Sequence, residues 1–246
     1  MEKLKNDILN FIKEYVASAH SKGVVVGMSG GKDSFIVAKL CALALGEENV
    51  FGVIMPNGNM KDIEIAREEC EILGIKYSVQ NIEEIYKKIE EISKNSIGTN
   101  ELAEVSTTNI APRIRMTILY TIAGTLGYLV ANTSNLSEKM IGYTTKWGDN
   151  VGDFAPLVGL TKTEVCELGL FLELPKHLVN KKPDDGLSGK TDEEKIGFSY
   201  AELDEFIRAG KKQENFDKIE RMHRISAHKR DGIKSFVTNK TNYFDK

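Results

Sequence analysis

An apolar run of β-branched residues stops abruptly at a short glycine-rich turn and then continues into a stretch of helix-forming residues. The run is Val24, Val25 and Val26, the turn spans 29–31, and the helix-forming stretch extends to Leu45. Such a run favours a buried strand, and the order of run, turn and helical stretch is typical of an α/β unit. This unit restricts the chain to folds in which helices cover a parallel sheet.

The turn has the composition of a phosphate-binding loop. Gly30 and Gly31 carry no Cβ, so the backbone can adopt positive φ and bring successive N–H groups close to an anion at the start of a helix. Ser29 and Ser34 add hydroxyl donors. Asp33 would repel a phosphate, but its carboxylate suits a Mg²⁺ ion that bridges phosphates. We therefore predict a site for phosphate and magnesium, with a plain glycine-rich turn as the alternative.

Strand-like and helix-like stretches alternate along much of the chain. Further short strands are expected at 50–55, 75–79 and 128–131, and helices at 2–20, 62–73, 82–92, 109–127, 161–172, 200–208 and 216–230. The polar stretch 93–107 is expected to be a loop. The alternation predicts a doubly wound, Rossmann-like parallel sheet flanked by helices, whose ligands collect at the carboxyl ends of the strands. The loop at 29–34 lies at such an end.

Composition limits the organisation of the chain and its partners. The 246 residues are 41% hydrophobic and contain no obvious linker, so residues 1–246 are expected to form a single domain. A net charge of -3 offers no broad basic surface for nucleic acid. Three widely spaced cysteines indicate neither a disulfide framework nor a zinc site, and no apolar stretch is long enough to cross a membrane. We expect a cytoplasmic enzyme with neither nucleic acid nor membrane as partner.

A second cluster of residues that are suited to ligand binding follows the strand predicted at 128–131. The stretch 132–153 combines glycines, acidic residues and two large aromatic side chains, Tyr143 and Trp147. Its Glu138 would complete a metal site with the aspartate of the glycine-rich turn. The two aromatic rings would stack on a flat ring of a ligand. A long surface loop without a ligand is the alternative.

Together these motifs resemble the ammonia-dependent NAD synthetases, which belong to the N-type ATP pyrophosphatases, over nearly the whole chain. The resemblance rests on the segments 29–34, 109–120, 133–138, 143–153, 160–165, 182–183, 191–193 and 228–230. Each motif alone is weak to moderate, so their number and order carry the resemblance. Three residues depart from the family pattern: Lys32 replaces an aliphatic residue, Asn132 a common glycine, and Asp184 a frequent serine or threonine.

The resemblance implies an adenine nucleotide α hydrolase-like fold and a ligase that forms NAD from deamido-NAD, ATP and ammonia through an NAD-adenylate. AMP and pyrophosphate are the implied products. Mg²⁺ is the implied cofactor, with Asp33 and Glu138 as its ligands, and Asp149 and Lys162 are the implied catalytic residues. No cysteine-containing amidase is present, so free ammonia is the expected nitrogen source.

The same resemblance divides the binding residues between the two nucleotides. ATP is expected to contact Ser29, Gly30, Gly31, Asp33, Ser34, Arg115, Thr133, Lys162 and Asp184. Deamido-NAD is expected to contact Arg113, Tyr120, Tyr143, Lys146, Asp149, Asp153, His228 and Lys229. The two arginines are two positions apart and should point to different faces of their helix, although a solvated ion pair is the alternative for each. The stretch 175–192 is expected to be a mobile lid, with a plain disordered loop as the alternative.

A homodimer with the dinucleotide bound between subunits is a further implication of the resemblance. The helix expected at 109–127 adds a physical reason. Besides a main apolar stripe through Met116 and Leu119, it carries isoleucines at every fourth position on a second face, namely Ile110, Ile114, Ile118 and Ile122. A partner subunit would cover that face, and a second layer of the same chain is the alternative.

Two other functions compete with NAD synthesis. A tRNA-modifying thiolase or ligase of the same superfamily is favoured by Lys32 but disfavoured by the acidic net charge and the lack of a cysteine pair. A non-catalytic regulator that binds ATP would be expected to lack acidic or lysine groups that this chain retains.

Overall fold

A parallel sheet of four strands forms the centre of the molecule, which is described by a computed structural model over residues 1–59, 62–181 and 191–236. The strands are β1 (Val24–Met28), β2 (Val50–Ile54), β3 (Lys76–Val79) and β4 (Leu129–Val130), in the order β3-β2-β1-β4. β1 pairs with both β2 and β4, and Val24 lies opposite Val50 on one side and Leu129 on the other. The chain therefore has the α/β architecture that its sequence predicts.

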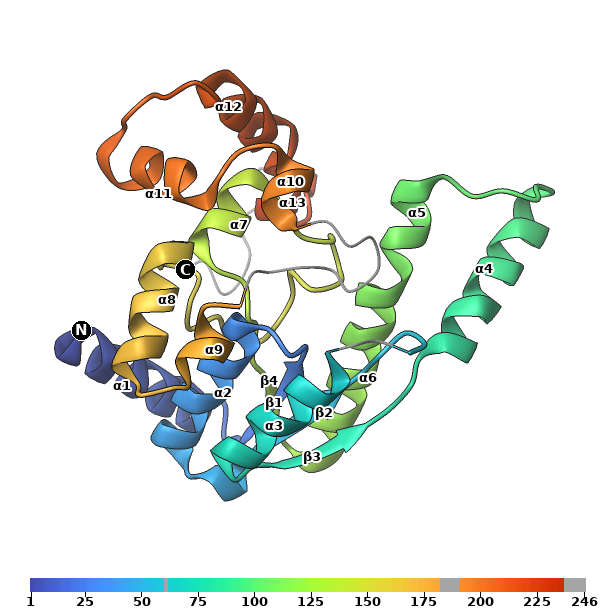
Figure 1. Cartoon of the computed structure of the whole chain (residues 1–246). Coiled ribbons are helices and arrows are strands. Elements are labelled where there is room, and N and C mark those ends of the chain that lie inside the picture. Colours follow the sequence, from blue (N-terminus) through green and yellow to red (C-terminus); the bar gives the residue numbers. More distant parts are fainter. Residues whose placement is uncertain (60–61, 182–190, 237–246) are drawn as a thin grey trace.

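Helices cover both faces of the sheet (Figure 1). One face carries α1 (Glu2–Ser18), α2 (Lys32–Leu45), α3 (Ile63–Leu73), α8 (Lys162–Phe171) and α9 (Lys176–Val179), and the other carries α4 (Glu83–Ile97) and α6 (Ile110–Leu126). Successive side chains of a strand point to opposite faces. Val24 and Val26 accordingly join the first core, and Val25 joins the second.

A third hydrophobic cluster joins the helices of the C-terminal part. These helices are α7 (Leu136–Ile141), α10 (Asp192–Ile196), α11 (Tyr200–Ala209) and α12 (Phe216–Ile225), and α13 (Ala227–Arg230) follows α12 without adding a residue to the cluster. The shared core includes Ile141, Leu203 and Ile219, each at most 2% exposed. In Figure 1 this group lies above the sheet, on the side where α2 begins. It can therefore contribute residues to a site at that end.

The expectation of a loop at 93–107 holds only for 98–103, and the residues on either side are helical. α4 continues to Ile97, and a short helix, α5 (Glu104–Thr108), precedes α6. A helix that is already nucleated extends through polar residues at little cost, and Gly98 ends α4 in the left-handed conformation at φ 66. In α5 the hydroxyls of Thr107 and Thr108 donate to the Glu104 carbonyl. The low apolar content of this stretch therefore reflects the exposure of its helices to solvent.

The isoleucine face of α6 packs against the sheet of its own chain. Ile110 and Ile114 are buried in the second core, and Ile118 and Ile122 pack against it while partly buried. The expectation that a partner subunit covers this face is therefore wrong, and the second layer of the same chain is the correct alternative. The face expected to be the main stripe is divided: Met116 and Tyr120 border a cavity, Leu119 borders it and also packs against the second core, and Ala123 is buried in that core.

None of the helices within the described ranges combines the length and the hydropathy that crossing a bilayer requires. Cys41, Cys70 and Cys166 are all free thiols, the first two buried and the third half-buried.

Candidate active site

The glycine-rich turn between β1 and α2 forms a tight loop at the carboxyl end of β1. Gly30 has φ +73, and a Cβ there would lie 2.7 Å from the carbonyl oxygen of Asp62, so only glycine fits without strain. Ser34 Oγ accepts from the Ser29 amide at 3.3 Å and donates to the Gly31 carbonyl at 2.9 Å. Gly31 is the N-cap of α2, so the first amides of the helix are left for an anion.

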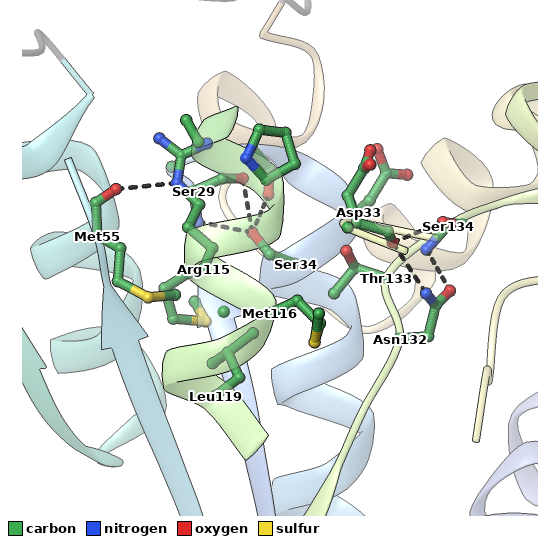
Figure 2. A pocket seen from close by; sticks show the side chains of 18 of the residues that line it. Ser29, Asp33, Ser34, Met55, Arg115, Met116, Leu119, Asn132, Thr133 and Ser134 are labelled. Carbon is green, nitrogen blue, oxygen red and sulfur yellow. Dashed lines mark hydrogen bonds between the residues drawn. The ribbon is translucent and has the colours of Figure 1, made fainter. Parts of the chain in front are cut away.

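This loop is one wall of a cavity of about 500 Å³. Figure 2 shows residues of the loop, of α6 and of the segment after β4 gathered around it. The predicted site residues that line it are Ser29, Gly30, Gly31, Asp33, Ser34, Arg115, Tyr120, Thr133, Glu138, Tyr143, Asp149 and Lys162. The structure thus brings most of the expected ATP residues, and part of the expected dinucleotide residues, to one place.

Three charged side chains meet in this cavity, each from the first turn of a different helix. Lys162 Nζ lies 2.8 Å from Asp33 Oδ2 and 2.7 Å from Glu138 Oε1. The three side chains are only 6%, 19% and 16% exposed, in that order. Capping boxes on Asn135 and Thr161 fix the starts of α7 and α8, which carry Glu138 and Lys162. The carboxylates also lie where helix dipoles favour negative charge.

A residue outside the cavity holds two of these helix starts together. Asp204, on α11, accepts from the Thr163 amide at 2.8 Å through one carboxylate oxygen and from the hydroxyl of Ser137 through the other. The same hydroxyl accepts from the amide of Lys162 at 2.9 Å. Asp204 is 6% exposed, so this link is shielded from water. The spacing between α7 and α8 is thereby fixed.

The environment changes the pKa of both ends of the ion cluster. Burial lowers the pKa of Lys162, but the carboxylates of Asp33 and Glu138 outweigh that effect and hold it well above its usual value. Burial raises the pKa of Glu138 to about 7, against the lowering effect of the Lys162 ammonium. Lys162 is therefore cationic at neutral pH, and Glu138 is stabilised as an anion chiefly by a neighbouring positive charge.

Asp33 and Glu138 fit the requirements of a magnesium ion. Their carboxylate oxygens already converge on a cation, the ammonium of Lys162. Within the described ranges there is no group of three or more His, Cys, Asp or Glu side chains that could hold a metal. Mg²⁺ usually takes one or two protein carboxylates and completes its octahedron with waters and substrate phosphates. The pair would thus hold magnesium together with a nucleotide.

Asp149 borders the cavity, and the residue is exposed although protein atoms surround its carboxylate. Its Oδ1 accepts from the Thr145 amide at 2.6 Å. Burial raises its pKa, and the hydrogen bonds from the backbone oppose that shift. A carboxylate with a raised pKa is a better proton acceptor than one with the ordinary pKa.

The two arginines of α6 diverge as their spacing predicts. Arg115 lies at the cavity and donates from Nε to the Met55 carbonyl at 3.0 Å. Arg113 is exposed and donates to the Lys146 carbonyl at 3.3 Å. Only Arg115 can therefore reach a ligand in the main cavity within this chain.

Tyr120 and Tyr143 lie at the cavity, and each hydroxyl is directed to a carboxylate. Tyr120 donates to Asp153 at 3.5 Å, and Tyr143 donates to Asp192 at 3.2 Å. Asp153 also accepts from the Val130 amide at 2.7 Å, which ties it to the end of β4. These contacts place the tyrosines as walls of the cavity beside groups that accept hydrogen bonds.

Other residues expected to contact the dinucleotide lie away from the main cavity. Lys146, Trp147 and His228 line a second hollow at the surface. Tyr143 and Trp147 thus border different hollows, and the expectation that both stack on one ring is not supported by this arrangement. The ammonium of Lys229 donates to the carbonyls of Gly142 at 2.7 Å and Thr144 at 2.6 Å, so it braces the loop.

The departures from the family pattern have distinct environments. Asn132 donates to the carbonyls of Asp149 and Val151, both at 3.0 Å, which a glycine could not do. Lys32 is 9% exposed and donates to the sulfur of Cys166 at 3.4 Å, so it does not point into solvent. Asp184 falls in 182–190, outside the described residues.

Part of the stretch expected to be a lid is packed helix. Leu178 and Val179 of α9 are buried in the first core. The rest of the stretch up to residue 190 lies outside the described residues, so closure over the nucleotide stays a prediction.

Besides Lys32, three charged residues of the cavity wall were not among the predicted site residues: Asp62, Lys181 and Asp192. Lys181 donates to Asp62 at 2.5 Å and to the Gly30 carbonyl at 3.1 Å. The only indication in the sequence that Lys181 belongs to the site was its place in a lysine-rich stretch beside Pro183. Asp62 and Asp192 stand at helix starts, where acidic residues are common for reasons of stability alone.

Comparisons with known proteins agree over almost the whole chain. A model of the NAD synthase family matches residues 4–244. The NH(3)-dependent NAD(+) synthetase of Finegoldia magna is 41% identical over 244 residues, which cover 98% of each chain. The NH(3)-dependent NAD(+) synthetase of Archaeoglobus fulgidus is 41% identical over 239 residues, which cover 94% of each chain.

Solved structures give the same picture. An NMN synthetase from Francisella tularensis superposes with a TM-score of 0.88 at 31% identity and covers 97% of this chain and 98% of its own. An NH3-dependent NAD synthetase from Campylobacter jejuni, in complex with the nitrate ion, superposes with a TM-score of 0.80 at 30% identity. The alignment covers 96% of this chain and 99% of the Campylobacter chain. These findings favour neither the tRNA-modifying enzyme nor the non-catalytic regulator.

Proposed function

The chain belongs to the NAD synthase family, and we propose that it forms NAD from deamido-NAD, ATP and ammonia in the cavity above the phosphate loop. The observation that carries this assignment of the site is the buried cluster of Lys162, Asp33 and Glu138 beside the start of α2. Phosphoryl chemistry requires charged groups next to the phosphates, and this cluster places such groups beside a loop that is shaped for an anion.

The first step activates the nicotinate carboxylate, whose oxygen is too poor a leaving group to be displaced by ammonia directly. A carboxylate oxygen attacks the α-phosphorus of ATP, and the bond to the oxygen that bridges the α- and β-phosphates breaks. The amides at the start of α2 and the hydroxyls of Ser29 and Ser34 receive the departing pyrophosphate. Lys162 offsets the negative charge on the phosphates, and Mg²⁺ held by Asp33 and Glu138 would supply further positive charge.

The second step forms the amide. Ammonia attacks the carbonyl carbon of the adenylate, and AMP leaves with the oxygen that the carboxylate contributed. Asp149 is placed to bind the incoming ammonium and to take up a proton, because it lies at the cavity and burial raises its pKa. Arg115 and Thr133 border the same cavity and would contact ATP there.

We further propose a homodimer that contacts through α4, α5 and the start of α6. Ile85, Ile89 and Ile92 line one side of α4 and are 48%, 36% and 52% exposed. Figure 1 shows α4 and α5 standing out from the body on the same side as α6. An apolar stripe of this kind is stabilised when a second surface covers it. A second copy of the chain would bring its residues close to Arg113.

A mononucleotide is the second candidate substrate, because the Francisella protein with the TM-score of 0.88 is an NMN synthetase. Nicotinate mononucleotide presents the same carboxylate for adenylation and lacks only the adenylyl half. Both amidations can therefore use one set of reactive groups.

The test is turnover of the purified protein with ATP, Mg²⁺ and ammonium, supplied with either deamido-NAD or nicotinate mononucleotide. We expect equal amounts of NAD and AMP from deamido-NAD, with a kcat/KM that exceeds the value for the mononucleotide. A larger kcat/KM for the mononucleotide would reassign the substrate. Release of AMP from neither substrate would refute the proposed function.

A further inference from the structure

A second ion pair contacts the phosphate loop at Gly30, and the proposed reaction makes no use of it. Lys181 lies two residues after α9, and Asp62 directly precedes α3. Lys181 Nζ lies 2.5 Å from Asp62 Oδ1 and 3.1 Å from the carbonyl oxygen of Gly30. The two charged side chains are 24% and 15% exposed. This pair is therefore part of the wall of the cavity.

The orientation of the Gly30 carbonyl decides where the next amide points. In a planar trans peptide the C=O of residue 30 and the N–H of residue 31 point in opposite directions. When Lys181 holds the carbonyl oxygen, the Gly31 amide is turned away from Lys181, in the direction of the free amides at the start of α2. Glycine on both sides of this peptide leaves its rotation nearly unopposed by sterics, so an external contact is needed to fix it.

The start of α3 restrains the same peptide from a second direction. A Cβ on Gly30 would lie 2.7 Å from the Asp62 carbonyl oxygen and 3.4 Å from the Ala66 amide, so the loop is pressed against α3. Asp62 contributes to this contact through its backbone and anchors the ammonium of Lys181 through its side chain. The Asp62 carboxylate also offsets the charge of that ammonium, which makes Lys181 a poor direct partner for a phosphate in this arrangement.

We propose that Lys181 is a positioning residue of the phosphate loop: it fixes the Gly30–Gly31 peptide so that the Gly31 amide faces pyrophosphate, and Asp62 holds the Lys181 ammonium in place. This inference rests on the proposed role of the loop as the pyrophosphate site. Donors that are already aimed at an anion need no reorganisation when it binds, and this is where the gain in affinity arises.

The test measures binding of inorganic pyrophosphate with Mg²⁺ to the full-length protein by calorimetry, with AMP as the comparison ligand. Lys181→Met should weaken pyrophosphate binding about tenfold or more, the usual range for loss of a hydrogen bond to a charged group. Asp62→Asn should weaken it in the same direction, and both variants should keep AMP affinity within about twofold. The double variant should bind no more weakly than Lys181→Met, because Asp62 acts through Lys181.

The sign of the Asp62→Asn effect separates positioning from direct contact. A lysine that bound phosphate directly would be released by this substitution, so tighter or unchanged pyrophosphate binding would overturn the proposal. Equal losses for AMP and pyrophosphate would overturn it as well, since they would indicate general distortion. Lys176→Met, at an exposed lysine of α9, is the matched control and should leave both affinities unchanged. A protein that shows the expected binding pattern but forms no NAD would refute the proposed function and leave the positioning role intact.

Discussion

The ammonium of Lys162 lies 2.7 Å from Glu138, in the position between two carboxylates that a divalent cation would take. The lysine and the cation are therefore competitors unless phosphates are present to draw the ammonium away. Lys162→Met should let Mn²⁺, used as a paramagnetic probe, bind more tightly in the absence of nucleotide, by at least tenfold. It should also lower the rate of NAD formation by about 100-fold or more, in the range of a lost charge that stabilises the transition state.

Electron paramagnetic resonance of free Mn²⁺ measures the first effect independently of activity. Lys139→Met, which removes an exposed lysine of α7, is the matched control for the change in net charge. Unaltered Mn²⁺ affinity in Lys162→Met would show that the lysine does not compete for the metal position.

Asp33→Asn and Glu138→Gln should each keep the fold and remove most of the activity. Both substitutions preserve shape but replace an anionic oxygen with a neutral amide, which is a much weaker ligand for magnesium. We expect a loss of at least about 100-fold in kcat at limiting Mg²⁺, with a melting temperature close to that of the wild type. Steady-state rates over a magnesium titration, paired with thermal unfolding, provide the measurement. Wild-type turnover in both variants would remove these residues from the metal site.

Glu69 should make the stability of the protein fall as the pH rises. It is 1% exposed, and neither carboxylate oxygen has a hydrogen-bond partner. Burial raises its pKa from 4.5 to about 8, so between these values the folded protein retains a proton that the unfolded chain has released. Unfolding free energy therefore decreases with pH across this window and levels off above it. At about 1.4 kcal/mol per pKa unit the upper limit of the effect is roughly 4 to 5 kcal/mol.

Urea unfolding at several pH values from about 5 to about 8, within the window set by these two pKa values, measures that slope. Glu69→Gln should flatten the slope. Relative to the wild type, the variant should therefore gain more stability at the alkaline end of the pH range than at the acidic end. Glu68→Gln, at the neighbouring position with a side chain 49% exposed, should leave the slope unchanged. A slope that is equal in the wild type and in Glu69→Gln would assign the pH dependence to other groups.

A charge on the exposed stripe of α4 should dissociate the proposed dimer without unfolding the chain. Ile92 is 52% exposed, so Ile92→Asp removes little buried surface within one subunit. Sedimentation velocity should show a dimer for the wild type and a monomer for this variant. Ile118→Asp is a contrasting variant, because Ile118 packs against the second core and its substitution should lower the melting temperature instead. A wild-type protein that sediments as a monomer at micromolar concentration and is fully active would refute the dimer.

Local patterns in the sequence predicted the order of the helices and strands and the presence of a phosphate loop. The run of valines, the glycines and the helix stretch are neighbours in the chain, so their mutual arrangement follows from local geometry alone. The pairing of Asp33 with Glu138 as metal ligands came from residue chemistry and the family resemblance, and the structure brings both carboxylates to the Lys162 ammonium.

The errors arose where one pattern serves two purposes. An apolar face of α6 that lines a cavity has the same periodicity as one that packs against a sheet, so Met116 and Ile114 could not be sorted by spacing. The contact between Asp62 and Lys181 joins residues 119 positions apart, and no local rule relates them. The separate places of Tyr143 and Trp147 follow from the path of an irregular loop, in which Trp147 adopts a positive φ of 62 that its side chain does not favour.

Asp204 has no access to the cavity, yet both of its oxygens bind residues at the starts of helices that carry reactive charges. The distance between Lys162 and Glu138 is thus controlled from α11, a helix that packs in the C-terminal cluster and also pairs its Arg208 with Glu164 of α8. Sequence changes on α11 can retune the electric field at the phosphates while every group that touches substrate stays the same. Two members of such a family could therefore differ in rate although their substrate-contacting residues are identical.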